Sequence, residues 1–430
     1  MGTLDLIVRN CKLRNKNGLW DVGIQNGRFV EIKEKIPQGG TREIDAAGNL
    51  VTPPIHDPHI HLDAVLSVGD PRYNNSGTLL EGIQIWGERK KYLTKDMIKK
   101  NAIEAIKWEV AQGVQTIRTH ADTTEPNLIT VEALVEVREE VKDLADIQIV
   151  AFPQDGIYTS TQGESQMRRA IAMGADVIGG IPHNEFTRED GVRDVEFAFN
   201  LAEETGCLID IHVDETGDDQ SRFIEVMASE AIKRNMGDRV CASHATAMHN
   251  YNNDYAFKLI GIIARSNMHI ITNPFDNSVL QNRTDGYPRR RGHTRVDELI
   301  QRGVNVCIGH DSIMDPWYPM GKGSLLQGAN LLMHTAHLSG YNQIPKLFDM
   351  VTDNSAKALN LSDGNEIREG KLANFIVLDA QGEMDAIRLE SECLYVFRKG
   401  IPIVETTPAK RILSQNGKKE MIDFKIKSPL

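Results

Sequence analysis

The sequence is poor in cysteine and contains no paired cysteine motif. Its 430 residues include five cysteines, and none of them is part of a C-x-x-C pair. Several lie inside apolar runs, so we expect buried free thiols, a usage that fits a reducing cytoplasm better than secretion. The five are Cys11, Cys207, Cys241, Cys307 and Cys393.

Long apolar stretches and an excess of positive charge are also missing. No segment approaches the ~18 consecutive apolar residues of a membrane span, and residues 1–5 lack the charged and apolar regions of a signal peptide. The net charge of −11 argues against a nucleic-acid binder, and the basic run 289–291 is too short to reverse this. We expect a soluble, cytoplasmic protein that binds neither membranes nor nucleic acids.

Short β-rich segments occur at both ends of the chain, whereas the middle of the chain has a different sequence pattern. Near the start, Asn26-Gly27 is a tight-turn signal between two of them. The chain also exceeds the ~250–300 residues at which a single core stops growing. We therefore predict one small β domain built from residues 1–53 and 366–430, with a larger catalytic domain over residues 54–365.

The middle of the chain alternates between short apolar strands and helical patterns. One such helix is expected to begin after Thr94 and to end before Gly113. Alternation of this kind predicts βαβ units and a parallel sheet, and eight units favour a closed (β/α)₈ barrel over a doubly wound open sheet. The expected strands cover residues 50–55, 114–119, 147–152, 177–181, 208–213, 240–244, 269–273 and 304–311.

Histidine and aspartate residues follow several of these strands at their carboxyl ends, where barrel enzymes build their active sites. His59 and His61 alternate along an extended chain, so both imidazoles point the same way. His212 ends the fifth strand, and Asp311 ends the eighth. Three imidazoles and one carboxylate suit Zn²⁺ or Fe²⁺. We predict that these four residues hold one divalent metal ion.

Two further residues are predicted to take part in catalysis. Glu215 lies three residues beyond His212, where a carboxylate can take a proton from an attacking water and deliver it to a ring nitrogen. A surface carboxylate at a helix start is the alternative, and the neighbouring Asp214 is expected to be loop scaffolding. His244 ends the sixth strand and is expected to hydrogen-bond the attacking hydroxide, with a role as metal ligand also open.

Other residues at strand ends are expected to shape a substrate pocket. The amide of Gln154 matches the N–C=O edge of a pyrimidine, with a turn-stabilising role as the alternative. Trp317 offers a wall on which a flat ring can stack, with loop packing as the alternative. His120 and His183 are expected to shape or support the pocket. No lysine ends the fourth strand, where two-metal barrel hydrolases commonly carry one, and this argues for one metal ion.

Several segments along nearly the whole chain resemble the amidohydrolase superfamily and, within it, the bacterial cytosine deaminases. The resemblance implies a distorted (β/α)₈ TIM barrel with a β-sandwich made from both termini, one Fe²⁺ or Zn²⁺, a small heterocyclic base as substrate, and a homo-oligomer. It implies that Glu215 shuttles protons, that His244 activates hydroxide and that Gln154 holds the amide edge of the substrate. The segments that carry it are 57–63, 76–79, 148–154, 220–223, 243–249 and 315–319.

One departure from that pattern affects the expected substrate. The deaminases that this chain resembles carry a second aspartate directly after the metal-binding one, whereas this chain has Ser312 after Asp311. In the family pattern the second carboxylate abuts the C5 edge of the pyrimidine, and a smaller serine leaves room for a substituent. We expect deamination of cytosine, 5-methylcytosine or both, giving uracil or thymine and ammonia.

Other activities remain open from the sequence. Val213 and Asn184 also depart from the pattern and keep creatinine, isocytosine and isoguanine as possible substrates. A ring-opening amidohydrolase acting on a cyclic amide is a second alternative, but such enzymes usually need two metal ions. A non-catalytic relative that serves as a binding module is a third, and retention of all four metal positions and Glu215 argues against it.

Overall fold

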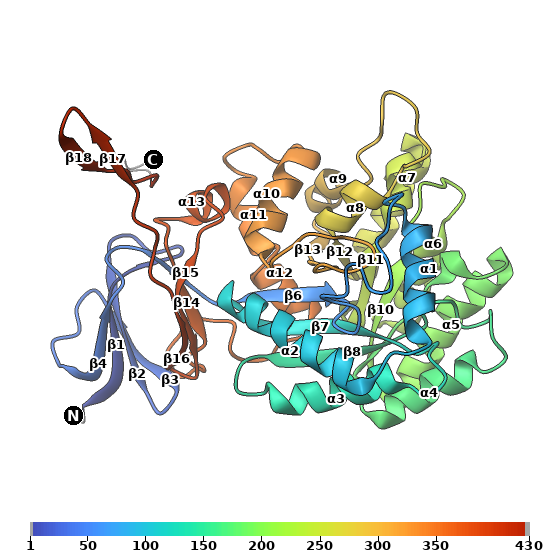
Figure 1. Ribbon diagram of the computed structural model, residues 1–430, viewed down its shortest axis with the longest axis horizontal. Helices are drawn as coiled ribbons and strands as arrows, with labels where there is room; N and C mark the ends of the chain where they lie inside the picture. Colours follow the sequence, from blue (N-terminus) through green and yellow to red (C-terminus); the bar gives the residue numbers. More distant parts are fainter. Residues whose placement is uncertain (1–2, 426–430) are drawn as a thin grey trace.

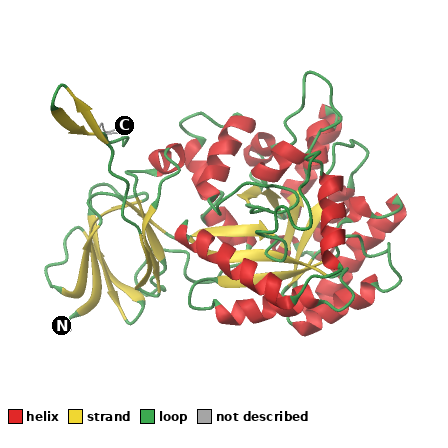
Figure 2. Cartoon of the chain, in the orientation of Figure 1, coloured by secondary structure: helices red, strands yellow, loops and turns green. Residues whose placement is uncertain are grey.

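In the computed structural model, which describes residues 3–425, a parallel β-barrel enclosed by helices stands beside a second β-sheet (Figures 1 and 2). Each barrel strand pairs in parallel with the next along the chain. This confirms the predicted (β/α)₈ architecture. The barrel strands are β6 (Ile55–Ile60), β7 (Val114–Asp122), β8 (Asp146–Phe152), β9 (Val177–Ile178), β10 (Leu208–Val213), β11 (Val240–His244), β12 (His269–Thr272) and β13 (Asn305–Ile308).

The barrel closes where the end of β6 meets the segment after β13. Ile60 forms a parallel bridge with Asp311. The backbone N–H of Asp311 donates to the carbonyl of His59 at 2.8 Å, and that of His61 donates to the carbonyl of Asp311 at 3.0 Å. This seam, formed by residues 59–61 and 311, brings two of the three predicted histidine ligands, His59 and His61, beside the predicted aspartate ligand, although about 250 residues separate them in the chain.

The prediction of the first barrel strand at residues 50–55 was wrong. Residues Leu50–Thr52 form β5, which pairs with strands of the other sheet. The barrel begins only with β6, after Pro53-Pro54. Both β5 and β6 are buried along their whole length, so their apolar character could not indicate which sheet each would join. The remaining predicted strands each overlap an observed barrel strand.

Helices cover the outside of the barrel (Figure 2). The predicted helix is α2 (Lys95–Ala111), and its start is confirmed because the Thr94 side chain accepts a hydrogen bond from the N–H of Met97. Gly113 follows its end with a φ of +94°, a conformation that suits glycine. The others are α1 (Leu79–Lys90), α3 (Ile129–Glu140), α4 (Gly163–Met173), α5 (Arg188–Thr205), α6 (Phe223–Arg234), α7 (Asn253–Ser266), α8 (Pro274–Leu280), α9 (Val296–Gln301), α10 (Leu325–Thr335), α11 (Ile344–Asp349), α12 (Asp353–Ala358) and α13 (Glu383–Arg388).

The second sheet contains strands from both ends of the chain, as predicted. Besides β5, its strands are β1 (Leu4–Leu13), β2 (Trp20–Gln25), β3 (Arg28–Lys33), β4 (Gly40–Asp45), β14 (Phe375–Leu378), β15 (Cys393–Arg398) and β16 (Ile401–Glu405). Their order is β16-β15-β14-β5-β1-β2-β3, with β4 paired to β1. The predicted turn at Asn26-Gly27 joins β2 to β3, and both residues have positive φ. Strands β17 (Ile412–Gln415) and β18 (Lys418–Met421) pair with each other in a separate two-stranded sheet.

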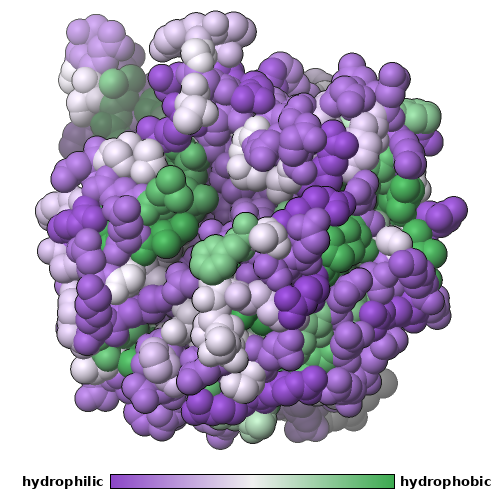
Figure 3. Space-filling view, turned by 90° about the vertical axis from the view of Figure 1, so that its right-hand side faces the viewer, coloured by the Kyte–Doolittle hydropathy of each residue, from purple (hydrophilic) through white to green (hydrophobic). Residues whose placement is uncertain are grey.

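The burial of the cysteines and the hydrophilic character of the surface are consistent with the composition of the sequence. All five cysteines are free, and four of them are buried while Cys207 is half-buried. The face in Figure 3 is mainly hydrophilic, with hydrophobic side chains in scattered patches. The basic run 289–291 is exposed. Among residues 3–425, no helix is both long and apolar enough to span a membrane.

Candidate active site

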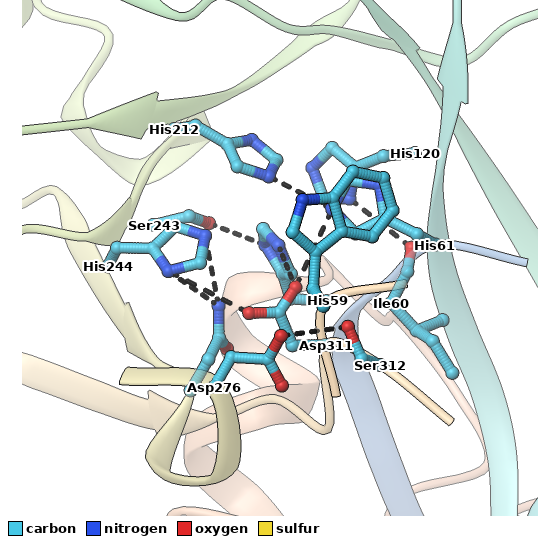
Figure 4. A network of polar contacts seen from close by, with 12 residues as sticks. His59, Ile60, His61, His120, His212, Ser243, His244, Asp276, Asp311 and Ser312 are labelled. Carbon is cyan, nitrogen blue, oxygen red and sulfur yellow. Dashed lines mark hydrogen bonds and ion pairs between the residues drawn. The ribbon is translucent and has the colours of Figure 1, made fainter. Parts of the chain in front are cut away.

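Five histidines and an aspartate meet at the carboxyl end of the barrel, where their side chains point toward one another (Figure 4). They come from the ends of four strands and from the segment after β13, and each is at most 8% exposed. Parallel strands place their carboxyl ends at one edge, which explains why residues so distant in sequence converge. The six are His59, His61, His120, His212, His244 and Asp311.

The distances between these side chains suit a small cation. His61 Nε2 lies 3.1 Å from His212 Nε2. Asp311 Oδ1 lies 3.4 Å from His59 Nε2 and 3.5 Å from His61 Nε2. The ligand atoms of a tetrahedral zinc ion, with bonds of about 2.1 Å, lie about 3.4 Å apart. Three donor-atom pairs among the four predicted ligands, His61–His212, His59–Asp311 and His61–Asp311, therefore lie near the spacing that a single ion requires.

The predicted ligands are divided between two overlapping groups that share His59. His120 belongs to the first group and was predicted only to shape the pocket. Its ring centroid lies 4.1 Å from that of His59, so the structure places it among the possible ligands. The groups, in each of which the ligand atoms lie within 4.8 Å of one another, are His59, His61, His120 and His212, and His59, His244 and Asp311.

The protonation of these histidines also fits a cation. The Nε2 atoms of His59 and His120 are buried and have no hydrogen-bond partner. Burial lowers the pKa of His61 to about 3 and lowers the pKa of His59 and His212 well below the ordinary value. Neutral imidazoles with free lone pairs are the form that binds metal ions. The residues present thus fit a divalent cation.

Glu215 lies beside this cluster, next to its member His244. Glu215 follows β10 and is only 7% exposed, so the alternative of a surface carboxylate is wrong. His244 Nδ1 lies 3.6 Å from Glu215 Oε1 and 3.8 Å from Asp311 Oδ2. Burial raises the pKa of Glu215 to about 8. Asp214 accepts hydrogen bonds from Ser221 Oγ and two backbone N–H groups, which confirms its role as loop scaffolding.

Amide side chains near α8 support both of these residues and were not predicted. Gln281 Nε2 donates to Glu215 Oε1 at 3.2 Å, and Asn277 Nδ2 lies 3.0 Å from His244 Nδ1. Asn273 Nδ2 lies 3.3 Å from His244 Nε2. These residues follow the seventh barrel strand, and that position at a strand end was the signal that could have identified them.

A small cavity opens beside the cluster. Its volume is about 210 Å³, below the ~300–1,000 Å³ of sites for drug-sized ligands, so it suits a single small ring. The three residues predicted to contact the substrate, Gln154, Ser312 and Trp317, all line it, and so does His183, whereas His120 does not. Gly82 makes room for the indole of Trp317, because a Cβ at Gly82 would lie 2.4 Å from Trp317 Cδ1.

The cavity also contains a carboxylate that was not predicted. Ser312 Oγ donates to Asp276 Oδ2 at 2.8 Å, as Figure 4 shows. Asp276 lines the cavity, is 2% exposed, and has no hydrogen-bond partner for Oδ1. A carboxylate therefore stands beside Ser312, but it comes from α8 rather than from the position after Asp311. Its place in the sequence Pro274-Phe275-Asp276, just beyond a strand, was the available signal.

Comparison with known proteins shows which solved structures this chain is similar to. The chain is similar to the crystal structure of 5-methylcytosine deaminase from Klebsiella pneumoniae liganded with 5-fluorocytosine, at 44% sequence identity and a TM-score of 0.91, covering 94% of this chain and 98% of that one. The same Klebsiella enzyme liganded with phosphonocytosine matches at 44% identity and a TM-score of 0.92, covering 94% and 99%.

A relative and a family model extend the comparison. N-isopropylammelide isopropyl amidohydrolase from Pseudomonas sp. (strain ADP) is 31% identical over 411 residues, which cover 93% of this chain and 97% of that protein. The model of the amidohydrolase family matches residues 42–404. The resemblance found in the sequence is thereby confirmed, and the chain belongs to the amidohydrolase family.

Proposed function

We propose that this protein is a metal-dependent hydrolytic deaminase of a free pyrimidine base. Its substrate is cytosine, 5-methylcytosine or both, and its products are uracil or thymine and ammonia. The observation that carries this proposal is the small cavity lined by residues of the histidine–aspartate cluster and by Glu215. The similarity to a 5-methylcytosine deaminase at 44% identity supports the choice of substrate.

The metal ion, Fe²⁺ or Zn²⁺, is assigned to His59, His61, His212 and Asp311. The distances of 3.1–3.5 Å between neighbouring donor atoms support this set. Bound there, a divalent cation activates water and polarises the carbon–nitrogen bond that is broken. His120 remains the alternative to Asp311 as fourth ligand, and metal analysis of variants at these two positions distinguishes them.

Protein side chains perform the proton transfers. Glu215 takes a proton from the attacking water and delivers it to the ring nitrogen next to the amino-bearing carbon. The resulting hydroxide adds to that carbon. Glu215 then carries the proton of the added hydroxyl to the amino group, which leaves as ammonia when the carbon–oxygen double bond forms. Gln281 holds the Glu215 carboxylate in place through its hydrogen bond, and His244 hydrogen-bonds the hydroxide as it adds.

The remaining cavity residues orient the base. The Gln154 amide offers a donor and an acceptor to the N–H and carbonyl of the pyrimidine, and Trp317 covers its flat face. At the Ser312 end of the cavity, the Ser312–Asp276 contact faces the C5 edge of the ring. We also propose that the protein is a homo-oligomer and that it is located in the cytoplasm.

Ser312→Asp is expected to lower the ratio of kcat/KM for 5-methylcytosine to that for cytosine by about 10–200-fold, the range that one methyl group contributes in a pocket. The larger, charged side chain would occupy the space of the methyl group and would face the Asp276 carboxylate. Steady-state ammonia release with both bases measures the ratio. Ser312→Ala is the matched control, since it keeps the space open, and an unchanged ratio in Ser312→Asp would show that Ser312 does not select the substrate.

An ammonia-release screen of the purified protein tests the function itself. The panel contains cytosine, 5-methylcytosine, isocytosine, isoguanine and creatinine, and isopropylamine release from N-isopropylammelide is measured beside it. We expect turnover of cytosine, 5-methylcytosine or both to exceed that of every other compound. Isopropylamine release without turnover of either pyrimidine would instead assign the activity named for the 31% identical relative, and the proposal would be rejected.

A further inference from the structure

We propose that Ser243, Asp210 and Arg118 form a buried chain of hydrogen bonds that orients His59 toward the metal ion. They act as positioning residues, because none of them lines the cavity. The inference rests on the metal site of the proposed function but not on the identity of the substrate.

The chain of contacts runs from the cluster into the interior of the barrel. His59 Nδ1 lies 2.9 Å from Ser243 Oγ, a contact drawn in Figure 4. Ser243 Oγ donates to Asp210 Oδ1 at 2.6 Å. The other oxygen of that carboxylate, Oδ2, accepts from Arg118 Nη1 at 3.0 Å. All four residues are 0% exposed, so water does not compete for these contacts.

The positions of the protons in this chain of hydrogen bonds determine the tautomer of the His59 imidazole. A serine hydroxyl carries one hydrogen, and Ser243 donates it to Asp210. The hydrogen between Ser243 and His59 must therefore belong to Nδ1 of the imidazole. The Nε2 atom of His59 then bears the lone pair, and this is the atom that lies 3.4 Å from Asp311 Oδ1. The chain of hydrogen bonds thus selects the tautomer and the ring orientation that His59 needs as a metal ligand.

The positions of the charged residues follow from strand periodicity. Arg118 lies two residues before His120 on β7, and Asp210 lies two residues before His212 on β10. Side chains two residues apart on a strand share a face, so the Arg118–Asp210 pair forms a layer beneath the histidines. A contact with another strand also holds the guanidinium of Arg118, since Arg118 Nε donates to Gln148 Oε1 at 3.0 Å.

Stability alone does not account for this pair. Burying two charges costs desolvation free energy, and the attraction between the charges does little more than offset that cost. A buried ion pair is therefore weak evidence of a stabilising role. Partners behind metal-binding histidines, in contrast, commonly change metal affinity by about 10–100-fold when they are removed. The direct contact of the chain with His59 Nδ1 therefore indicates a role in metal binding.

Zinc affinity of the chelator-stripped protein, measured by competition with a chelating dye, tests the inference. Ser243→Ala is expected to weaken Zn²⁺ binding by about 10–100-fold, and Ser243→Thr, which keeps the hydroxyl, to restore most of the affinity. Ser355→Ala is the matched control. Ser355 is equally buried at 0% exposure, and its hydroxyl donates to the backbone carbonyl of Met350.

The outcomes separate this inference from the proposed function. Wild-type protein that fails to bind one equivalent of Zn²⁺ would reject the metal site itself. Wild-type protein that binds Zn²⁺, together with Ser243→Ala of unchanged affinity, would overturn the positioning chain alone. Asp210→Asn provides a second variant of nearly equal volume and is also expected to bind Zn²⁺ more weakly. Circular dichroism verifies that each variant is folded before its affinity is compared.

Discussion

Glu215→Gln is expected to lower kcat for ammonia release by about 10²–10⁴-fold, the range that a positioned general acid–base group contributes. Glutamine has nearly the same shape and can still contact Gln281, but it cannot accept a proton from water and deliver it to the ring. Because Glu215 is not one of the proposed ligands, the bound metal should remain stoichiometric. A large fall in kcat with unchanged metal content is therefore the distinctive result.

Steady-state kinetics and metal analysis of the same preparations check this expectation. Asp219→Asn is a suitable control, since Asp219 is an exposed carboxylate on the same loop, four residues beyond Glu215. It should retain wild-type kcat. If Glu215→Gln kept more than about a tenth of the wild-type kcat, the residue would not be the proton shuttle.

Loss of the metal ion is expected to have an effect of similar size. His61→Ala should lose stoichiometric metal and at least about 10³-fold in kcat, because a metal ion contributes several kcal/mol to the transition state and each 1.36 kcal/mol corresponds to a factor of ten in rate. Stripping the wild-type protein with a chelator should have the same effect. Addition of Zn²⁺ or Fe²⁺ should restore the activity of the stripped wild type but not that of the variant.

Elemental analysis, ammonia release and thermal unfolding together measure this prediction. A metal ion that binds only the folded state increases the free energy of unfolding by about 2.7 kcal/mol at a free concentration of 100 times its Kd. Zn²⁺ should therefore raise the melting temperature of the stripped wild type and leave that of His61→Ala unchanged. His334→Ala changes an exposed histidine on α10 and serves as the control. Full activity in metal-free protein would contradict the proposed chemistry.

The sequence was informative about the barrel because spacing along the chain is a local property. Apolar strands separated by helical patterns predicted the parallel pairing from β7 to β13, and Thr94 predicted the start of α2. The first strand was misplaced because β5 and β6 are adjacent, equally buried and separated by two prolines. Which of two sheets a buried strand joins depends on contacts with distant segments, and those are absent from a local pattern.

The same distinction applies to the site. His59, His61, His212, His244 and Asp311 were predictable because each stands at or just beyond the end of a strand, and the barrel brings such positions together. Asp276 stands there too and was overlooked because it lies behind a proline at the start of α8. The contact between Arg118 and Asp210 joins residues inside two apolar strands 92 positions apart, and no spacing rule links them.

The pairing of β5 has a consequence for biosynthesis. One edge of β5 pairs with β1, made shortly before it, and the other pairs with β14, which begins at Phe375. While the ribosome makes the intervening residues, the second edge has no partner, and an unpaired strand edge is prone to association with other chains. Strand β6, which contains His59 and is followed by His61, comes directly after β5. Premature termination before β14 would thus leave an exposed, aggregation-prone strand attached to an otherwise complete set of barrel strands.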